Sequence, residues 1–203
     1  MTTRPDVRKR HAEQREQTRR RILDVARGLL EDRPWSEISI DDVTKGADLT
    51  RTAFYRHFPD QRALLMALVE DVGLQLDVIA DPWVLTEGDP AEQVGAALTD
   101  LATVYEQHGR LLRAIADAAT QDREVAQMYA ELGARLSKGA ADRIRHEVAA
   151  GRSHVADPDE VAAALVWMNE RYLLDRFGRA PISGDPERAA LALAEVWVRT
   201  VYG

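Results

Sequence analysis

Apolar residues recur at three- and four-residue spacing along most of the chain, the pattern of helices with one buried face. The first such stretch begins at Gln17, and Pro34 predicts its end within a residue or two of Arg33. Residues 1–16 show no apolar periodicity, and we expect them to form a flexible basic arm. The apolar positions of the first helix are Ile22, Val25, Ala26, Leu29 and Leu30.

Two short helices and a long one are predicted next. Ser39, followed by two aspartates, predicts the N-cap of a short helix that runs to about Ala47. After a three-residue break, Thr50 predicts the cap of a second short helix, from Arg51 to about His57. A long amphipathic helix then begins at Pro59-Asp60.

The remaining residues predict further helices and no strand. One begins at Asp89-Pro90, is interrupted at Gly109, and is followed by a shorter helix over 110–119. The next covers about 122–150. The last two begin at Asp157-Pro158 and Asp185-Pro186, where an N-cap precedes a proline, and cover about 158–177 and 186–202. The fold class is therefore all-α, with about nine helices.

Composition excludes several classes of protein. Hydrophobic residues make up 45% of the 203, so a sizeable core can be buried. The absence of cysteine excludes disulfides, thiol catalysis and cysteine-ligated zinc. No apolar run approaches the roughly 20 residues of a membrane span, and the charged N-terminus lacks a signal-peptide core. We therefore expect a cytoplasmic location and no membrane partner.

The charge is unevenly distributed. The net charge is −7, yet residues 1–27 contain nine Arg or Lys and four Asp or Glu. A basic arm on an acidic body can orient a protein on DNA. A solvated, disordered tail explains the same charge equally well, so the arm alone does not decide between the two.

The segment 38–65, ISIDDVTKGADLTRTAFYRHFPDQRALL, carries the functional signal. Two short helices joined by a tight turn cannot bury a core alone, and packed on their neighbours they form a helix-turn-helix. In the second helix Ala53, Phe54 and Phe58 can face the core. The polar residues 51, 52 and 55–57 are left for solvent or DNA. The alternative, a helical hairpin without a DNA partner, leaves the polar face and basic flank unexplained.

This segment resembles the DNA-binding domain of TetR-type bacterial regulators over about residues 17–65. Asp48 replaces the usual turn glycine, and Gln61-Arg62 replaces the usual Lys-Glu pair. The resemblance implies a DNA-binding domain over 17–62 and a helical ligand-binding and dimerisation domain over 63–203. The positions that fit the family pattern are Ala47, Leu49, Thr50, Phe54, Tyr55, His57 and Phe58.

Arginine can read guanine, threonine can meet a thymine methyl, and tyrosine and histidine can contact phosphates. The Thr50 hydroxyl and the free N-terminal amides of the second helix suit a phosphate. Arg62 can replace the phosphate contact of the family's lysine. The candidate DNA-binding residues are Arg20, Ser39, Lys45, Thr50, Arg51, Thr52, Tyr55, Arg56, His57 and Arg62.

Three stretches of the body resemble a narrower mycobacterial group in this family, the ethionamide-resistance repressors. They are LLEDRP at 29–34, MNER at 168–171 and WVRTVYG at 197–203. The resemblance implies an elongated apolar ligand in a tunnel, hydrogen-bonded by Asn169 and closed at one end by Trp197. It also implies a homodimer through the last two helices.

Each ligand candidate has a structural alternative. Asn169 can instead satisfy a neighbouring helix, because buried polar groups are normally paired. Residues of the kinds found at Leu98, Leu101, Tyr105 and Tyr129 are more often simple core residues than ligand contacts. Trp167, Tyr172 and Val198 can pack across a two-fold interface or against the chain's own body. The candidate ligand-binding residues are Leu98, Leu101, Tyr105, Tyr129, Asn169, Leu173 and Trp197.

No pattern of residues indicates an enzyme. The five histidines lack metal-ligand spacing, and no phosphate loop, nucleophile elbow or dinucleotide motif occurs. We expect no cofactor or metal, and we interpret Glu170-Arg171 and Glu195-Arg199 as ion pairs. The sequence predicts a ligand-responsive regulator, most simply a repressor, that binds a palindromic operator as a dimer. The alternative is a helical carrier of small ligands without sequence-specific DNA function.

Overall fold

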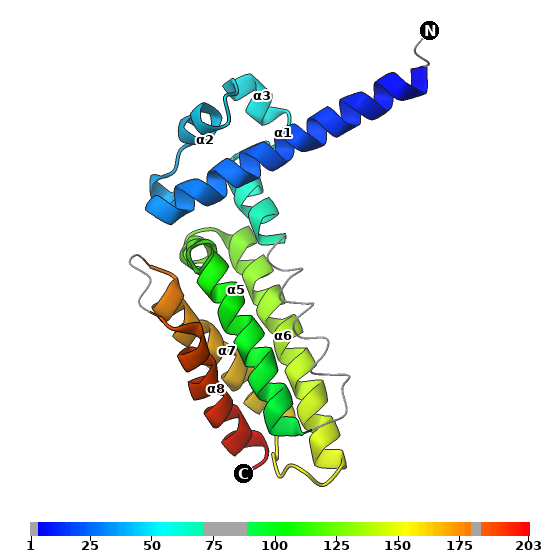
Figure 1. The fold of residues 1–203 in the computed structure, drawn as a ribbon, viewed down its shortest axis with the longest axis vertical. Coiled ribbons are helices and arrows are strands. Elements are labelled where there is room, and N and C mark those ends of the chain that lie inside the picture. Colours follow the sequence, from blue (N-terminus) through cyan, green and yellow to red (C-terminus); the bar gives the residue numbers. More distant parts are fainter. Residues whose placement is uncertain (1–3, 71–88, 180–183) are drawn as a thin grey trace. The chain divides into compact units, whose positions relative to one another are not determined.

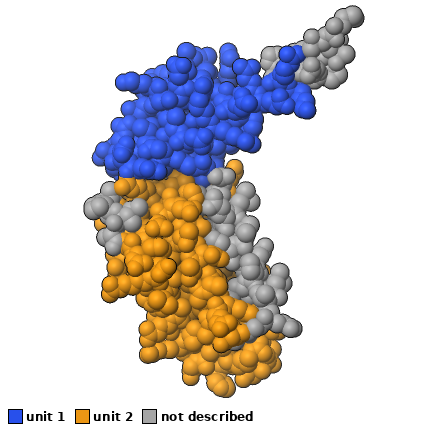
Figure 2. Space-filling view, viewed as in Figure 1, with its two compact units in different colours: residues 1–68 blue, residues 69–203 orange. Residues whose placement is uncertain are grey.

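The computed structural model describes residues 4–70, 89–179 and 184–203, and these ranges contain helices and no strand. The all-α prediction is confirmed. The chain forms two compact units, residues 1–68 and 69–203 (Figure 2). No helix in the described ranges has an apolar stretch of the length that a membrane span requires.

The first unit begins with α1, Arg4–Asp32, and continues with a short 3-10 helix, Trp35–Glu37 (Figure 1). It ends with α2, Ile40–Gly46, then α3, Arg51–Tyr55, and a helix that starts at residue 61 and is described to residue 70. The buried side chains of this unit include Ile22, Ala26, Leu30, Val43, Phe54, Phe58, Leu64 and Leu65. They come from every α-helix of the unit, which is how two short helices gain a core.

The start of α1 differs from the prediction. The helix begins at Arg4, so the segment 1–16 is largely helical rather than an irregular arm. Its residues are mostly Arg, Glu, Gln and Ala, which have high helix propensity without any apolar periodicity. The i, i+4 pair of Glu16 and Arg20, at 3.1 Å, adds support on the exposed surface.

The second unit contains four long helices: α5, Pro90–Ala119; α6, Arg123–Ala149; α7, Pro158–Phe177; and α8, Pro186–Val201. Helix α5 packs against the other three, and α6 also packs against α7 (Figure 1). Each helix starts after an aspartate whose carboxylate accepts a hydrogen bond from a first-turn amide. The predicted starts of α5, α7 and α8 are confirmed, and α6 starts one residue later than predicted.

The predicted break at Gly109 is wrong, because α5 runs through it without interruption. The predicted helix over 110–119 is the C-terminal part of α5. A Cβ at position 109 would lie 2.6 Å from the backbone oxygen of Phe177 at the end of α7. The glycine therefore permits a close approach between two helices rather than ending one.

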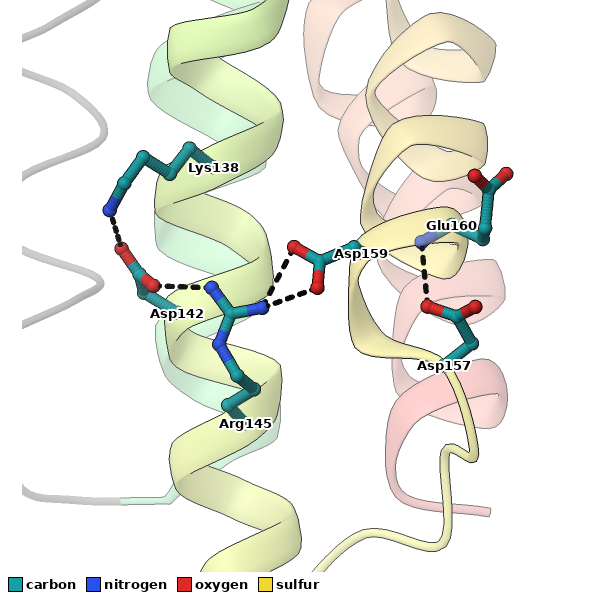
Figure 3. A network of polar contacts seen from close by, with 6 residues as sticks. All are labelled: Lys138, Asp142, Arg145, Asp157, Asp159 and Glu160. Carbon is teal, nitrogen blue, oxygen red and sulfur yellow. Dashed lines mark hydrogen bonds and ion pairs between the residues drawn. The ribbon is translucent and has the colours of Figure 1, made fainter.

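Polar contacts fix the register of the helices of this unit. The guanidinium of Arg145 on α6 donates to both carboxylate oxygens of Asp159 at the start of α7, at 2.8 and 2.7 Å (Figure 3). The same guanidinium contacts Asp142 at 2.6 Å, and Asp142 accepts from Lys138. Arg143 of α6 donates to Gln93 of α5 at 2.9 Å. The start of α5 and the start of α7 therefore both lie beside the C-terminal half of α6.

Candidate functional site

The turn between α2 and α3 is built by backbone hydrogen bonds around one left-handed residue. Asp48 has φ of 50°. Its N–H donates to Lys45 O at 3.3 Å, and the N–H of Leu49 donates to Thr44 O at 2.9 Å. This pair of bonds is the Schellman arrangement, which normally uses glycine at the left-handed position. Aspartate tolerates that conformation better than most residues, so the turn keeps its geometry without glycine.

Capping side chains fix where α2 and α3 begin. The Ser39 hydroxyl accepts from Asp42 N at 3.2 Å, and Asp42 Oδ2 accepts from Ser39 N at 2.8 Å. The hydrogen bond from the Ser39 hydroxyl, then that from its backbone N–H, lowers the pKa of Asp42 to about 2, and Arg33 adds to the effect. Thr50 caps α3, because its hydroxyl accepts from Ala53 N at 3.2 Å. Ser39 and Thr50 thus have structural roles, whatever else they bind.

Helix α3 divides into a buried and an exposed side. Phe54 and Phe58 are buried in the unit's core, and Ala53 is half-buried. Arg51, Thr52, Tyr55 and Arg56 are exposed, and Tyr55 retains 48% of its accessible surface. The structure therefore presents four adjacent polar side chains on one short helix.

The other candidate DNA-binding residues lie on the elements around α3. Lys45 is exposed in the last turn of α2, and Arg20 is exposed on α1 beside Glu16. Arg51 lies 3.2 Å from Asp41, and Arg62 lies 3.7 Å from Asp60. Both are partly exposed ion pairs of a kind that contributes little to stability.

His57 differs from the prediction that it faces solvent. It is half-buried, and its Nδ1 has no hydrogen-bond partner among the described residues. Burial lowers the pKa of His57, and the nearby charges of Arg15, Arg19 and Arg56 lower it further. The lowered pKa favours the neutral imidazole at neutral pH, so His57 supplies little charge to this surface.

The second unit contains an apolar cavity of about 130 Å³, partly open to the surface, among its four described helices. Its wall includes side chains from α5, α6, α7 and α8. The lining residues are Val94, Ala97, Leu98, Leu101, Tyr105, Leu112, Tyr129, Leu132, Gly133, Leu136, Gly139, Ala140, Val166, Trp167, Asn169, Glu170 and Trp197.

The structure brings six of the seven candidate ligand-binding residues to this wall: Leu98, Leu101, Tyr105, Tyr129, Asn169 and Trp197. The seventh, Leu173, does not line the cavity. It has no accessible surface and belongs to the core of the unit. It lies one turn after Asn169 on α7, which is enough to move it from the cavity wall into the interior.

Asn169 and Trp197 form a buried hydrogen bond at the cavity wall. The indole Nε1 donates to Asn169 Oδ1 at 3.0 Å. An indole N–H can only donate, so the amide oxygen must face Trp197. Asn169 also lines the cavity, and the described residues form no other hydrogen bond with its side chain.

Sequence reasoning missed Glu170. We predicted an ion pair with Arg171, but Glu170 lines the cavity and accepts a hydrogen bond from the hydroxyl of Tyr129 on α6. Burial raises the pKa of Tyr129, and the hydrogen bond to Glu170 raises it further. Burial also raises the pKa of Tyr105, with a contribution from the charge of Glu170. The usable signal was spacing, since Val166, Trp167, Asn169 and Glu170 lie on one helical face.

Helices α7 and α8 leave large apolar side chains exposed. Trp167 retains 41%, Leu191 72% and Val196 41% of its accessible surface. Tyr172 and Val198, which the sequence also placed at a possible interface, are half-buried. The predicted ion pair between Glu195 and Arg199 is present on α8, at 2.7 Å.

Two family models match the chain. Residues 22–68 match bacterial regulatory proteins of the tetR family, and residues 94–203 match the C-terminal domain of the transcriptional regulator EthR. The HTH-type transcriptional regulator EthR of Mycobacterium tuberculosis (strain CDC 1551 / Oshkosh) is 32% identical over 188 residues, which cover 90% of this chain and 86% of that protein. The EthR of Mycolicibacterium smegmatis is 28% identical over 188 residues, covering 90% and 85%.

Solved structures share the fold. A regulatory protein of the tetR family from Rhodococcus RHA1 has a TM-score of 0.75 at 17% identity, covering 91% of this chain and 96% of that chain. The regulator PfmR from Thermus thermophilus has a TM-score of 0.74 at 18% identity, covering 89% and 98%. The relatives are transcriptional regulators, which confirms the prediction that this chain is not an enzyme. The chain belongs to the TetR family of bacterial regulatory proteins and is a transcriptional regulator with a C-terminal domain of the EthR type.

Proposed function

We propose that this regulator is a ligand-responsive repressor. It binds a palindromic operator as a homodimer in the cytoplasm and is released by a small, largely apolar effector. The observation that carries the proposal is the combination, in one chain, of an exposed polar α3 and an apolar cavity with a few polar groups. Ligand sites in proteins typically have that mixture.

The first unit supplies DNA recognition. Arg51 and Thr52 lie in the first turn of α3, the part of a recognition helix that meets base edges in the major groove. Tyr55, Arg56, Lys45 and Arg20 are exposed donors suited to phosphates. His57 and Arg62 complete the edge of this surface, and the amides capped by Ser39 and Thr50 favour nearby anions.

The second unit supplies ligand binding. Leu98, Leu101 and Tyr105 of α5 and Tyr129 of α6 give an apolar surface, and Trp197 closes it from α8. The unpartnered amide N–H groups of Asn169 would donate to an acceptor on the effector. A ligand without an acceptor would leave that amide unsatisfied, which costs about 1–3 kcal/mol, so we expect selection for one.

A second copy of the chain is the proposed partner of α7 and α8. Trp167, Leu191 and Val196 expose large apolar surfaces on these two helices, and exposed apolar residues in such numbers commonly mark an interface. A symmetric dimer also accounts for a palindromic operator, whose half-sites lie about 34–36 Å apart.

Coupling between ligand and DNA requires only a difference in affinity. The helix that starts at residue 61 continues the chain from the first unit into the second. Some arrangements of the dimer would hold the two recognition helices at a distance that does not match the operator. An effector that binds such an arrangement more tightly would weaken operator binding. Couplings of this kind are typically about 1–3 kcal/mol, or 5- to 150-fold in affinity.

The decisive experiment compares the Kd of the purified protein for the DNA upstream of its own gene with that for a scrambled fragment, at one fixed salt concentration. We expect a preference of roughly 10³-fold or more. Equal, weak and strongly salt-dependent binding to both fragments, and to any fragment recovered by a genome-wide selection, would contradict the proposal and favour a small-ligand carrier.

Two substitutions on α3 test the assignment of the DNA surface. Arg51→Ala should weaken operator binding by about 1–3 kcal/mol and relax the preference at one base position. Tyr55→Phe should weaken binding to operator and scrambled DNA alike, because only a phosphate contact is lost. Lys138→Ala on α6 is the control, because it removes an exposed cation that lies outside the first unit, α7 and α8. Wild-type affinities for both α3 variants would show that another surface reads the DNA.

A further inference from the structure

Among the described residues of the cavity wall, Glu170 is the only charged one, and no described residue of opposite charge pairs with it. Glu170 accepts one hydrogen bond, from the hydroxyl of Tyr129, and no Lys, Arg or His in the described part of the chain forms an ion pair with it. Segments 71–88 and 180–183, whose structure is not described, contain no basic residue. A carboxylate beside an apolar cavity is costly unless a positive or donating group meets it.

Arg113 is a basic residue that could balance the charge of Glu170, but it already forms an ion pair with Asp117. The positive charge of Arg113 on α5 lies close enough to Tyr129 to oppose the rise in the pKa of its hydroxyl. However, the Arg113 guanidinium donates to both oxygens of Asp117, at 3.0 and 3.1 Å. Arg113 and Asp117 together carry no net charge, so this end of the cavity keeps the negative charge of Glu170.

Aromatic rings stand next to this carboxylate. Trp167 lies three residues before Glu170 on α7, and its ring packs edge-on against Tyr129 with centroids 5.9 Å apart. Gly133 lets the indole come this close, because a Cβ there would lie 2.8 Å from the ring. Tyr105 lines the same part of the wall from α5. Aromatic rings beside a carboxylate are the environment that binds ammonium groups in proteins.

Apart from Glu170, Asn169 and the tyrosine hydroxyls, the described wall of the cavity is apolar, and the cavity is elongated. Tyr129 and Ala140 both line it, and the eleven residue steps from one to the other along α6 span about 16 Å at 1.5 Å per residue. The hydrogen bond between Gln93 and Arg143 places Val94 and Leu98 of α5 beside the Ala140 end. The contact between Tyr129 and Glu170 marks the other end. The polar and apolar parts of the wall therefore lie at opposite ends.

We propose that the effector is an amphiphilic organic cation. Its ammonium head binds Glu170 beside the paired rings of Tyr129 and Trp167, and its apolar tail lies along Val94, Leu98 and Ala140. This inference rests on the proposed function, because it assigns a chemical class to the effector of the same cavity.

The test uses four probes with the same eight-carbon tail and different heads: octylamine, octyltrimethylammonium, 1-octanol and octanoate. Isothermal titration calorimetry on the full chain, below the concentration at which the probes aggregate, gives each Kd. We expect both cations to bind at least tenfold more tightly than octanol, and octanoate to bind most weakly. Equal Kd values for the cations and octanol, or a preference for octanoate, would overturn the proposal.

Glu170→Gln keeps the size of the side chain and its contact with Tyr129 but removes the charge. We expect it to weaken octylamine binding about tenfold and to leave octanol binding unchanged. Tyr129→Phe should weaken octyltrimethylammonium little, since the aromatic face remains. Glu160→Gln, which removes an exposed carboxylate from the first turn of the same helix, is the matched control. An unchanged ratio of octylamine to octanol affinity in folded Glu170→Gln would contradict the proposal.

The failure of this inference and that of the proposed function have different signatures. If octanol binds as well as the cations and operator binding is specific, only the charge-based assignment fails. If no probe binds at all, the ligand-binding role of the cavity fails with it. If the cations bind but operator affinity is absent or unaffected, the cavity takes organic cations and the repressor mechanism is wrong.

Discussion

Asp48 occupies the position where the backbone between α2 and α3 turns left-handed. Its φ of 50° strains most side chains that carry a Cβ, and branched side chains most of all. The turn sets the angle at which α3 leaves α2, so a single residue determines how the exposed side chains of α3 are presented.

We expect Asp48→Val to lower the free energy of unfolding by about 1–2 kcal/mol, because a β-branched residue cannot adopt this φ without strain. Asp48→Gly is the control, since glycine adopts the conformation freely, and should change stability by less than about 0.5 kcal/mol. Urea unfolding followed by circular dichroism measures both. Equal stabilities of the two variants would mean that the turn is not left-handed.

Gly109 shows how a single atom determines the packing of α5 on α7. Gly109→Ala should destabilise the protein by about 1–3 kcal/mol, because the new Cβ would meet the Phe177 carbonyl at 2.6 Å. Gly95→Ala on the same helix is the matched control, because nothing lies within 4 Å of its Cβ. It should be neutral or stabilise by up to about 1 kcal/mol. Thermal unfolding of both variants checks the difference, and a stable Gly109→Ala would show that the helices can separate there.

At the residue scale, the sequence predicted the roles of residues whose interactions are with their neighbours in the chain. Ser39 and Thr50 were predicted as caps because capping depends on the next three residues. Glu170 and Gly109 were misread because their roles depend on α6 and α7, which lie far away in sequence. Glu170 stands next to Arg171 in the sequence, so it resembles half of a surface ion pair until the packing of α7 is known.

Helix boundaries followed mostly from local signals, and their deviations have physical causes. Helices α2, α3 and α7 lie within two residues of the predicted limits, because capping residues mark their starts. Helix α1 extends further than predicted because helix propensity does not require an apolar face. Apolar periodicity therefore locates the buried part of a helix better than its full length.

The capping box of α2 makes a pH-dependent contribution to stability. Asp42 has its pKa lowered to about 2 in the folded protein, against about 4 for an unfolded aspartate. A depressed folded pKa stabilises the protein above the unfolded pKa, and the effect disappears as pH falls through about 2. The stability advantage of the wild type over Asp42→Asn should therefore be full above pH 4 and vanish near pH 2.

Urea unfolding of the two proteins between pH 2 and pH 7 measures that difference. Ser39→Ala supplies an independent check, because loss of the hydroxyl should raise the pKa of Asp42 in a carboxyl NMR titration. A stability difference that stays constant across this pH range would show that the capping box does not form.

At the scale of the whole molecule, the single chain leaves large apolar side chains of α7 and α8 exposed to water. The sequence placed a dimer interface on these helices through a family resemblance, and it named Trp167, Tyr172 and Val198. Of these, Trp167 is the one that the structure leaves strongly exposed, together with Leu191 and Val196. Which apolar residues remain exposed depends on how four helices share one core, and periodicity along a single helix does not contain that information.

If α7 and α8 form the proposed dimer interface, Leu191→Glu should yield a monomer, because a charge would replace an apolar side chain that is 72% exposed in the single chain. Operator affinity should fall at least tenfold, since one half-site alone would be bound. Val148→Glu on α6 is the control, because it alters an exposed apolar residue outside α7 and α8. Sedimentation velocity and fluorescence anisotropy measure mass and affinity, and a dimeric Leu191→Glu with unchanged affinity would place the interface elsewhere.

The hydrogen bond between Trp197 and Asn169 has a practical consequence. Two of the four tryptophans, Trp167 and Trp197, stand in the cavity wall, so the protein carries its own fluorophores at the proposed ligand site. Indole emission depends on the polarity around the ring, and the proton on Nε1 gives a separate NMR signal that depends on its acceptor. A ligand that displaces the Asn169 amide from Trp197 should therefore shift the NMR resonance of the indole Nε1 proton and also change the tryptophan emission. Because the chain has no cysteine, a single engineered thiol on α3 could carry a second dye. Filling of the cavity and movement of the recognition helix could then be recorded at once in the same molecule.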